Sequence, residues 1–408
     1  MKAIMRDKSE LKDSGIEYLG HVPKNWKLAS AKFFVSIANG SDPKTDGDVP
    51  VYGSGKGSFR TCGESKEGPA VLLGRKGTVD IPQYIEGKYW NVDTAFDVKA
   101  KSGYVLRFFY YLSTCFDYKR YSTQTALPSM TQTNYNSMRI IVPDISEQED
   151  IISYLDDCCS KIDAIIDEAK ASIEEYKELK QAVIYEAVTK GLDKTVDMKI
   201  YNDWFDKCPS NWEYKQIRYL YELRDERNFK PLSEVNLISL YTDQGVIQHA
   251  DIEKTSGNKA VTADGYKKVY PEDIVVNIIL CWMGAMGRSE YEGVTSPAYD
   301  VYKPIGCSKV CSRYYHYLFR TDRFSKKCYT VGRGIMMMRW RTYSSQFRAI
   351  KVPVPPYNEQ IEIANYLDKR ISNMEELINA KQSLIKDLEA YKKSLIYEVV
   401  TGKRKVVA

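Results

Sequence analysis

Two long segments of the chain carry apolar residues at alternating steps of four and three residues. The first segment runs from Glu147 to about Lys190 and contains no internal proline or glycine. Its repeat is close to about 3.5 residues, which predicts a helix packed lengthwise on another helix. Ser146 is the expected N-cap and Gly191 the expected stop. The apolar positions are Ile151, Leu155, Cys158, Ile162, Ile165, Ala169 and Ile173, and, after one slip of phase, Tyr176, Leu179, Val183 and Ala187.

The second segment has the same pattern and runs from Asn358, another expected cap, to Gly402. Its apolar positions are Ile363, Leu367, Ile371, Met374, Leu377, Leu384, Leu388, Tyr391, Leu395 and Val399. Such a helix would span roughly 65 Å at ~1.5 Å per residue, and it would not be stable alone. We therefore expect the two helices to pair antiparallel through Ile151, Leu155, Ile162, Ile363, Leu367 and Leu388. The alternative is that each helix packs on its own globular domain.

Outside these segments the pattern changes to short alternating runs. Residues 27–145 contain VPVYGSGKGSF, AVLLGRKGTV and YIEGKYWNVDTAFDV, and residues 213–355 contain LISLYTDQGVI, YKKVYPEDIVVNIIL and SPAYDVYKP. Such runs, separated by glycines, predict strands and turns. One local helix is expected in each part, LRFFYYLSTCF from Leu106 and SRYYHYLFRT near Ser312. Both parts are therefore expected to be α+β.

The second half of the chain repeats the first. The matching positions share one offset of 212 residues: Glu147-Gln148 with Glu359-Gln360, Tyr154-Leu155-Asp156 with Tyr366-Leu367-Asp368, Ile184-Tyr185-Glu186 with Ile396-Tyr397-Glu398, and Thr189 with Thr401. Upstream, Pro23-Lys-Asn-Trp26 returns as Pro209-Ser-Asn-Trp212. The chain is thus a tandem of two units, each a variable globular part followed by a long helix. Two copies of one plan suit a target with twofold symmetry.

We predict an α+β fold with two globular domains in tandem, each followed by a long helix. The two helices are expected to form an antiparallel coiled coil with pseudo-twofold symmetry. The expected segments are 1–146 for the first globular domain, 147–198 for the central helix, 199–357 for the second globular domain and 358–408 for the C-terminal helix.

Charge is distributed unevenly along the chain. Residues 1–145 carry 20 Lys and Arg against 15 Asp and Glu, residues 199–357 carry 24 against 17, and the helix at 146–190 carries 5 against 12. Within 306–351, eleven basic residues accompany a single acid, Asp322. The basic globular parts favour a polyanionic partner, whereas the acidic helix is poorly suited to one.

Three sequence features bear on the location of the protein. The first thirteen residues are charged throughout and do not resemble a secretory leader. The most apolar run, DIVVNIILCWMGAMG from Asp273, is too short to span a membrane. The nine cysteines are scattered and odd in number, as in a protein with reduced thiols. We therefore expect a cytoplasmic protein with no membrane partner.

Motifs that would support catalysis are weak. GSGKGS from Gly53 lacks the first glycine of a phosphate-binding loop, and a turn between strands explains it. VPPY at Val354–Tyr357 resembles the base-holding motif of amino-methyltransferases, but valine cannot accept from a base amino group, so the prolines are interpreted as a linker. Glu86 and Lys88 have no partner acid that would make a metal nuclease, and Cys307, Cys311 and His316 lack a second cysteine pair for zinc. We expect no catalytic residue, metal or cofactor in this chain.

Binding residues are better represented. Arginine can contact guanine by two hydrogen bonds, Asn and Gln can read adenine, and Lys or Arg can neutralise phosphate. The candidates in the first unit are Lys56, Arg60, Arg75, Lys76, Asn91, Lys119, Arg120 and Gln124, with Gly74 and Gly77 allowing close backbone approach. The candidates in the second unit are Asn277, Arg288, Arg313, Arg333, Arg339, Trp340 and Arg341.

These features together resemble the specificity subunit of type I restriction-modification systems. The resemblance covers nearly the whole chain. It rests on SGIEYLGHVPKNWK, on the two VP…EQ…YLD regions, and on LLGRKGTVD…YWNVDTAF and GYKKVYPEDIVVN…SPAYDVYKP within the units. Asp80, in GRKGTVD, departs from the glycine-like turn expected there.

The resemblance implies two target-recognition domains, each reading one half of a split double-stranded DNA site, with the helices setting the spacer length. It implies no active site in this chain. Two modification subunits would carry S-adenosylmethionine and methylate adenine, and restriction subunits would use ATP and Mg²⁺ to cut. Our leading hypothesis is therefore a DNA-reading and scaffolding subunit. The alternatives are a stand-alone DNA methyltransferase or endonuclease, and a coiled-coil adaptor that does not bind DNA.

Overall fold

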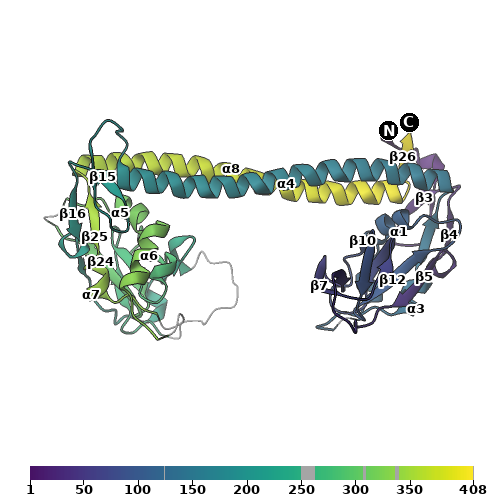
Figure 1. The fold of residues 1–408 in the computed structure, drawn as a ribbon, viewed down its shortest axis with the longest axis horizontal. Coiled ribbons are helices and arrows are strands. Elements are labelled where there is room, and N and C mark those ends of the chain that lie inside the picture. The colour runs from purple at the N-terminus through teal and green to yellow at the C-terminus, as the bar shows by residue number, and fades with distance from the viewer. Residues whose placement is uncertain (124, 250–261, 307–308, 336–339, 408) are drawn as a thin grey trace. The chain divides into compact units, whose positions relative to one another are not determined.

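The protein divides into two compact units, which are described here from a computed structural model (Figure 1). Unit 1 comprises Met1–Lys170 and Gln382–Ala408, and unit 2 comprises Ala171–Lys381. Each unit thus contains a globular domain and part of each long helix. The structure describes residues 1–123, 125–249, 262–306, 309–335 and 340–407.

The two long helices are α4, Ile145–Lys190, and α8, Tyr357–Val400. Their starts differ from the prediction, because Ser146 and Asn358 lie in the first turns and are not N-caps. In α4 the Gln148 N–H already donates to the Asp144 carbonyl at 2.9 Å, which extends the helix backwards. The predicted stop is confirmed, since Gly191 follows α4 directly with a left-handed φ of 70°.

Unit 1 is built on an antiparallel four-stranded sheet in the order β10-β9-β12-β5. Phe108 and Leu112 of α1 pack against Val71 and Leu73 of β9 in the main core. A second sheet has the order β7-β6-β11-β8, and the GSGKGS segment is the predicted turn between β6 and β7. The strands are β1 Lys2–Met5, β2 Leu11–Asp13, β3 His21–Pro23, β4 Lys27–Ser30, β5 Val35–Asn39, β6 Val49–Tyr52, β7 Ser58–Cys62, β8 Lys66–Glu67, β9 Ala70–Gly74, β10 Gln83–Ile85, β11 Lys88–Asn91, β12 Ala95–Ala100, β13 Arg139–Val142 and β26 Arg404–Val407, and the helices are α1 Leu106–Ser113, α2 Tyr118–Tyr121 and α3 Gln132–Ser137.

Unit 2 contains a matching antiparallel sheet in the order β17-β24-β21-β22. Tyr315 and Leu318 of α5 share its core with Ile274 and Val276 of β21. The residues Pro355 and Pro356 join β25 to α8, as the linker interpretation predicted. The strands are β14 Met198–Ile200, β15 Lys207–Pro209, β16 Glu213–Gln216, β17 Tyr221–Leu223, β18 Ile238–Tyr241, β19 Gly245–Gln248, β20 Lys267–Val269, β21 Ile274–Asn277, β22 Met286–Arg288, β23 Gly293–Thr295, β24 Tyr299–Pro304 and β25 Lys351–Val354, and the helices are α5 Ser312–Phe319, α6 Asp322–Val331 and α7 Ser344–Phe347.

The long helices pair antiparallel within each unit, as predicted (Figure 1). In unit 1 the predicted contacts Ile151, Leu155 and Ile162 share a core with Leu395 and Val399, and Leu388 packs against it. In unit 2 Ile363 and Leu367 share a core with Ile184 and Val188. Ion pairs join the helices as well, Lys392–Asp163 at 2.6 Å in unit 1 and Lys180–Glu375 at 2.5 Å in unit 2. Each helix also packs on its globular domain, so the alternative interpretation holds in part.

The predicted apolar stripe is wrong at some positions. Cys159 and Ile166 are buried in α4, whereas Ile165 is 47% exposed. In α8 Leu377 and Tyr391 are 46% and 52% exposed, although the pattern placed them in the contact. A strict seven-residue repeat drifts by about 20° per heptad on a straight helix, so its members leave the contact face.

The repeated Glu-Gln pair fixes each domain to the start of its helix. The Trp26 indole N–H donates to Glu147 Oε2 at 2.7 Å, and the Trp212 indole N–H donates to Glu359 Oε2 at 2.9 Å. The buried Gln148 accepts the N–H of Val105, which precedes α1, at 2.8 Å. Gln360 likewise accepts from Cys311, which precedes α5, at 2.9 Å.

The repeated aspartate makes a second connection between domain and helix. Asp156 accepts from the guanidinium of Arg107 at 2.8 Å and from the Tyr111 hydroxyl. Asp368 accepts from Arg313 at 2.5 Å and from the Tyr317 hydroxyl at 2.7 Å. The residues that repeat at the offset of 212 therefore include the buried and charged contacts that dock each domain on the helices.

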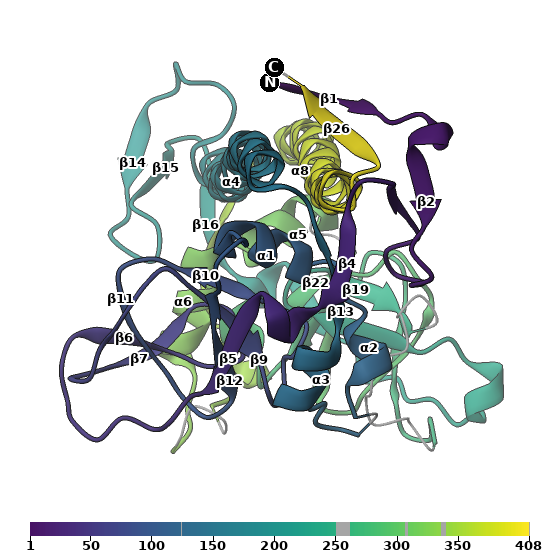
Figure 2. The same ribbon diagram turned by 90° about the vertical axis from the view of Figure 1, so that its right-hand side faces the viewer.

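The two ends of the chain lie side by side in unit 1 (Figure 2). Strands β1 and β26 pair antiparallel, with Lys2 opposite Val407 and Met5 opposite Arg404. Within the described residues, no helix combines the length and apolarity needed to cross a membrane.

Candidate nucleic-acid interface

Each unit presents a loop at the same place in its sheet. In unit 1 the loop follows β9 and leads to the edge strand β10, and in unit 2 it follows β21 and leads to the edge strand β22. Both loops are held by a second loop from late in the domain. The Met130 N–H donates to the Arg75 carbonyl at 2.9 Å in unit 1, and the Thr342 N–H donates to the Ile278 carbonyl at 2.9 Å in unit 2. These equivalent loop pairs carry several of the predicted binding residues.

In unit 1 the structure brings Lys56 and Lys76 into neighbouring loops. Gln83 clamps the turn 53–57, donating to the Gly53 carbonyl at 2.9 Å and accepting the Gly57 N–H at 2.8 Å. The backbones of Lys76 and Ser129 form an isolated antiparallel β-bridge. The Gly77 N–H donates to the Pro128 carbonyl at 2.9 Å. Lys56 and Lys76 are exposed, and Arg75 is half-buried with a bond of 3.3 Å to the Asp93 carbonyl.

The two glycines of this loop have different physical roles. Gly77 has a left-handed φ of 81°, and a Cβ added there would meet only Leu127 and Ser54, at 3.7 Å. At Gly74, by contrast, a Cβ would lie 2.2 Å from the Thr78 carbonyl. Gly74 is therefore required by the fold of the loop itself, and the prediction that it allows an approach of DNA is wrong.

Three further cations of unit 1 lie on the surface. Arg60 on β7 is exposed and pairs with Asp42 at 2.7 Å. Arg120 on α2 is exposed and pairs with Glu17 at 3.5 Å, and its neighbour Lys119 is exposed as well. Exposed pairs of this kind contribute little to stability and can exchange their partner for a phosphate. These residues stay predicted phosphate contacts.

In unit 2 the loop after β21 lies beside a backbone bridge. The backbones of Arg333 and Arg341 exchange two hydrogen bonds of 2.9 Å, which closes the loop that contains Trp340. The Arg333 side chain is exposed, and Arg341 and Trp340 are half-buried. The structure thus brings Arg333, Trp340 and Arg341 together, as the sequence cluster suggested. Arg339 in unit 2 and Gln124 in unit 1 lie outside the described residues.

The two predicted asparagines are corrected by the structure. Asn91 is fully buried, accepting from Lys66 Nζ at 2.6 Å and donating to the Ala95 carbonyl at 2.8 Å. Asn277 is 6% exposed, and its Oδ1 caps the following turn by accepting the Ile279 N–H at 3.0 Å. Asn91 uses both polar atoms inside the fold, and Asn277 is buried with its Oδ1 bonded, so neither side chain is available to read adenine.

Two predicted arginines are also corrected. Arg313 bonds to Asp368 and Asn365 of α8, so it docks the domain on the helix. Arg288 is 12% exposed and pairs with Glu290 at 3.0 Å and with Glu272 at 3.6 Å. Both side chains sit in ion pairs of the fold, which the sequence cluster alone could not distinguish from exposed cations.

The basic segment 306–351 is partly neutralised in the same way. Arg323 pairs with Asp206 at 3.1 Å and Lys327 with Asp203 at 2.7 Å, while Arg320 donates to backbone carbonyls of Thr242, Asp243 and Met286. The acids come from 203–206, about a hundred positions earlier in the chain. The positive charge left for a polyanion is therefore smaller than the composition of the segment indicates.

His316 contributes a neutral ring to this region. Burial, with Arg320 and Arg288 nearby, lowers the pKa of His316 to about 3. Its Nδ1 accepts the Arg288 N–H at 3.1 Å. One ring nitrogen is thus used inside the fold, and Cys307, which the sequence grouped with His316, lies outside the described residues.

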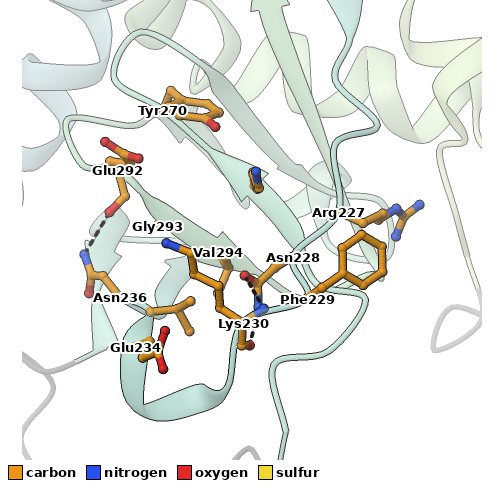
Figure 3. A pocket seen from close by; sticks show the side chains of 12 residues that line it. Arg227, Asn228, Phe229, Lys230, Glu234, Asn236, Tyr270, Glu292, Gly293 and Val294 are labelled. Atoms are coloured by element: carbon orange, nitrogen blue, oxygen red, sulfur yellow. Dashed lines mark hydrogen bonds between the residues drawn. The ribbon is translucent and has the colours of Figure 1, made fainter.

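A cavity of about 600 Å³ opens elsewhere in unit 2, where Phe229 and Lys230 face Tyr270 and Glu292 (Figure 3). Asn236 donates to the Glu292 carbonyl at 3.2 Å across its rim. Cations and acids are both present in its lining, so the cavity favours neither charge of ligand.

The exposed apolar side chains of the loop after β21 were not among the predicted binding residues. Leu280 and Met283 are 37% and 52% exposed, although they belong to the most apolar run of the chain. The signal was available in the glycines that follow, because Gly284 adopts a left-handed φ of 86° and ends the apolar run in a turn.

Comparison with known proteins identifies relatives of the chain. Residues 23–175 match the model of the type I restriction modification DNA specificity domain. A type I restriction enzyme MjaVIII specificity subunit from Methanocaldococcus jannaschii is 22% identical over 300 residues, which cover 69% of this chain and 66% of that protein. The alignment thus spans just under two thirds of that relative.

Solved structures share the fold. A chain from a study of complex assembly and conformational transition of the type I R-M system has a TM-score of 0.69 and 12% identity, covering 94% of this chain and 99% of that chain. The HsdS subunit from Thermoanaerobacter tengcongensis has a TM-score of 0.51 and 12% identity, covering 94% and 98%. The tandem of α+β domains, each followed by a long helix, is therefore an architecture that other proteins share.

Proposed function

This chain belongs to the type I restriction-modification specificity family, and from that premise we propose that it reads a split DNA target, with one half-site for each unit. The observation that carries the proposal is the pair of equivalent loops after β9 and β21. They occupy the same position in two matching sheets, but their sequences, RKGTVD and IILCWMGA, differ completely. Two scaffolds of one plan with different loops suit two different half-sites.

The family relationship favours this role over the alternatives. Members of the family are the DNA-recognition components of type I systems, so neither a stand-alone methyltransferase or endonuclease nor an adaptor without DNA contact is supported. We place S-adenosylmethionine on modification subunits, and ATP and Mg²⁺ on restriction subunits. The complex would work in the cytoplasm, where the DNA is.

Exposed apolar residues on the helices support the binding of two modification subunits. Ile165 and Tyr391 are 47% and 52% exposed in unit 1, and Leu377 and Leu179 are 46% and 43% exposed in unit 2. At the repeat offset of 212, Ile165 matches Leu377 and Leu179 matches Tyr391. Each unit therefore presents an equivalent apolar pair, with one residue from α4 and one from α8. Exposed apolar residues at matching positions suit two copies of one partner.

The proposal is tested by sequencing single DNA molecules from a host that expresses the chain with its neighbouring modification subunit. We expect methyladenine in a motif of two short half-sites separated by a gap of fixed length. A continuous motif would contradict the division between two units. If no methylation is found, binding of the purified complex to genomic fragments is measured at low salt. Absence of binding would reject the role in DNA recognition.

A further inference from the structure

Three aromatic rings lie together beside the loop after β21. The ring centroids of Trp282 and Tyr329 are 5.7 Å apart, and the rings of Tyr329 and Trp340 stack at 4.8 Å with an interplanar angle of 22°. Tyr329 is 40% exposed, and Met283, next to Trp282, is 52% exposed. A surface of this kind is unusual for a loop, since large apolar groups are normally covered.

The polar atoms of both indoles are used inside the fold. The Trp282 N–H donates to the Ile279 carbonyl at 2.9 Å, and the Trp340 N–H donates to the Tyr329 carbonyl at 3.0 Å. With Met283, these two side chains therefore offer apolar contact and no hydrogen-bond donor to a ligand. They cannot read the donors and acceptors of a base edge.

The loop is held in place before any ligand binds. Cys281 is buried, as is Cys328 of α6 beneath it. Asn277 caps the start of the loop, and Gly284 ends it with a left-handed φ. Because the backbone is fixed at both ends, the exposed thioether of Met283 is presented without a large cost in loop entropy.

The charge around this apolar surface favours DNA as its occupant. Trp282 and Met283 line a cavity of about 660 Å³ in which four cations accompany three acids: Lys177, Lys180, Arg320 and Lys326 against Asp243, Asp322 and Glu375. Lys326 is exposed, and so is Arg333, which lies near Trp340 in the sequence. Residues 199–357 carry 24 Lys and Arg against 17 Asp and Glu. A basic domain that surrounds an apolar group suits a polyanion with an apolar feature in its groove.

We propose that Met283 and Trp282, backed by Tyr329 and Trp340, contact the 5-methyl group of a thymine in the major groove of the half-site read by unit 2. Among the four bases, thymine alone presents an apolar group in the major groove. This assignment rests on the proposed function of the chain. It predicts that one half-site is recognised partly by apolar contact, whereas the equivalent loop of unit 1, after β9, presents the exposed Lys76.

The test uses the complex of the full chain with its modification subunits and the target motif obtained by sequencing. Each thymine of the two half-sites is replaced in turn by deoxyuridine, which lacks only the methyl group, and binding is measured by fluorescence anisotropy. We expect one position, in one half-site, at which the wild-type complex binds about five- to tenfold more weakly. Met283→Ala should discriminate less than the wild type between the thymine and deoxyuridine duplexes at that position, because only Trp282 then contacts the methyl group.

Phe229→Ala is the matched control, because Phe229 is 81% exposed in the same unit but lines the separate cavity of Figure 3. It should retain the full sensitivity to deoxyuridine. Target half-sites without thymine, a wild-type complex that ignores the substitution, or equal sensitivity in Met283→Ala would each overturn the inference. Failure of the wild-type complex to bind any two-part target would instead overturn the proposed function.

Discussion

Whether a basic side chain of this protein is available to a ligand depends on the partner to which it is bonded within the fold. Arg313 donates to both Asp368 and Asn365 of α8, and Arg107 donates to Asp156 of α4 at the equivalent place. The two arginines therefore have one role in two units, which is to hold a globular domain on its helix.

We predict that Arg313→Ala lowers the free energy of unfolding of unit 2 by about 1 kcal/mol and leaves DNA affinity unchanged. The figure is small because both partners are more than a third exposed, at 35% and 42%, so solvent screens the pair. Chemical denaturation of the single variants and of Arg313→Ala/Asp368→Ala gives the coupling energy. A large loss of DNA affinity with unchanged stability would return Arg313 to the interface.

Lys76, which is exposed on the loop after β9, provides a direct test of the interface in unit 1. We predict that Lys76→Ala weakens DNA binding at low salt and reduces the slope of log affinity against log salt by about 0.9, the effect of one lost phosphate contact. Lys32→Ala is the control, since Lys32 is also exposed but belongs to the segment before β5, away from the loop after β9. Equal slopes for wild type and Lys76→Ala would remove Lys76 from the interface.

At the scale of elements, the long helices have two kinds of apolar residue. Leu155 and Leu367 are fully buried between helix and domain, whereas Ile165 and Leu377 are nearly half exposed. The first kind explains stability, and the second kind suits partner binding.

We predict that Ile165→Ser with Tyr391→Ser reduces the number of bound modification subunits from two to one, because it removes the exposed apolar pair of unit 1. Native mass spectrometry of the assembled complex counts the subunits. Leu179→Ser with Leu377→Ser, in unit 2, should give the same loss, and all four substitutions together should abolish assembly. Retention of two subunits by every variant would place the partner site elsewhere.

The long helices are also predicted to set the length of the spacer between the two half-sites. Deleting seven residues from α4 and the seven residues that face them in α8 shortens each helix by about 10 Å. We expect the unspecified gap in the target to shorten by about 3 base pairs, at ~3.4 Å each, with both half-sites unchanged. Sequencing of the methylated motif measures the gap, and an unchanged gap would reject the role as a ruler.

At the scale of the whole molecule, each unit depends on residues from distant parts of the chain. The core of unit 1 includes Leu395, Ile396, Val399 and Val400 from the end of α8, and β1 pairs with β26. Unit 1 therefore combines two separate stretches of sequence, Met1–Lys170 and Gln382–Ala408, whereas unit 2 is the continuous stretch Ala171–Lys381.

We predict that a chain ending at Gly191 is not a stable monomer, because the truncation uncovers Ile151 and Leu155. A second copy can cover them, since Ile184, Ala187 and Val188 repeat Ile396, Val399 and Val400 at the offset of 212. Sedimentation should therefore show a dimer. A monomer with cooperative unfolding would show that the end of α8 is dispensable.

The sequence by itself determined the tandem plan, the two long helices, the α+β domains and the resemblance to a family. Each of these depends on local periodicity or on repetition, which are properties of neighbouring or regularly spaced residues. The pairing of the two helices followed too, because long helices that cannot stand alone must cover each other's apolar stripe.

Only the tertiary structure decided which candidate residues are available to a ligand. Asn91, Asn277, Arg288 and Arg313 have the right chemistry, but their partners come from other strands and helices, as with Asp368 for Arg313. In the same way, Met283 belongs to an apolar run that reads as core, yet the turn at Gly284 leaves it exposed. Exposure and pairing depend on contacts between residues far apart in the chain, and a linear pattern does not contain them.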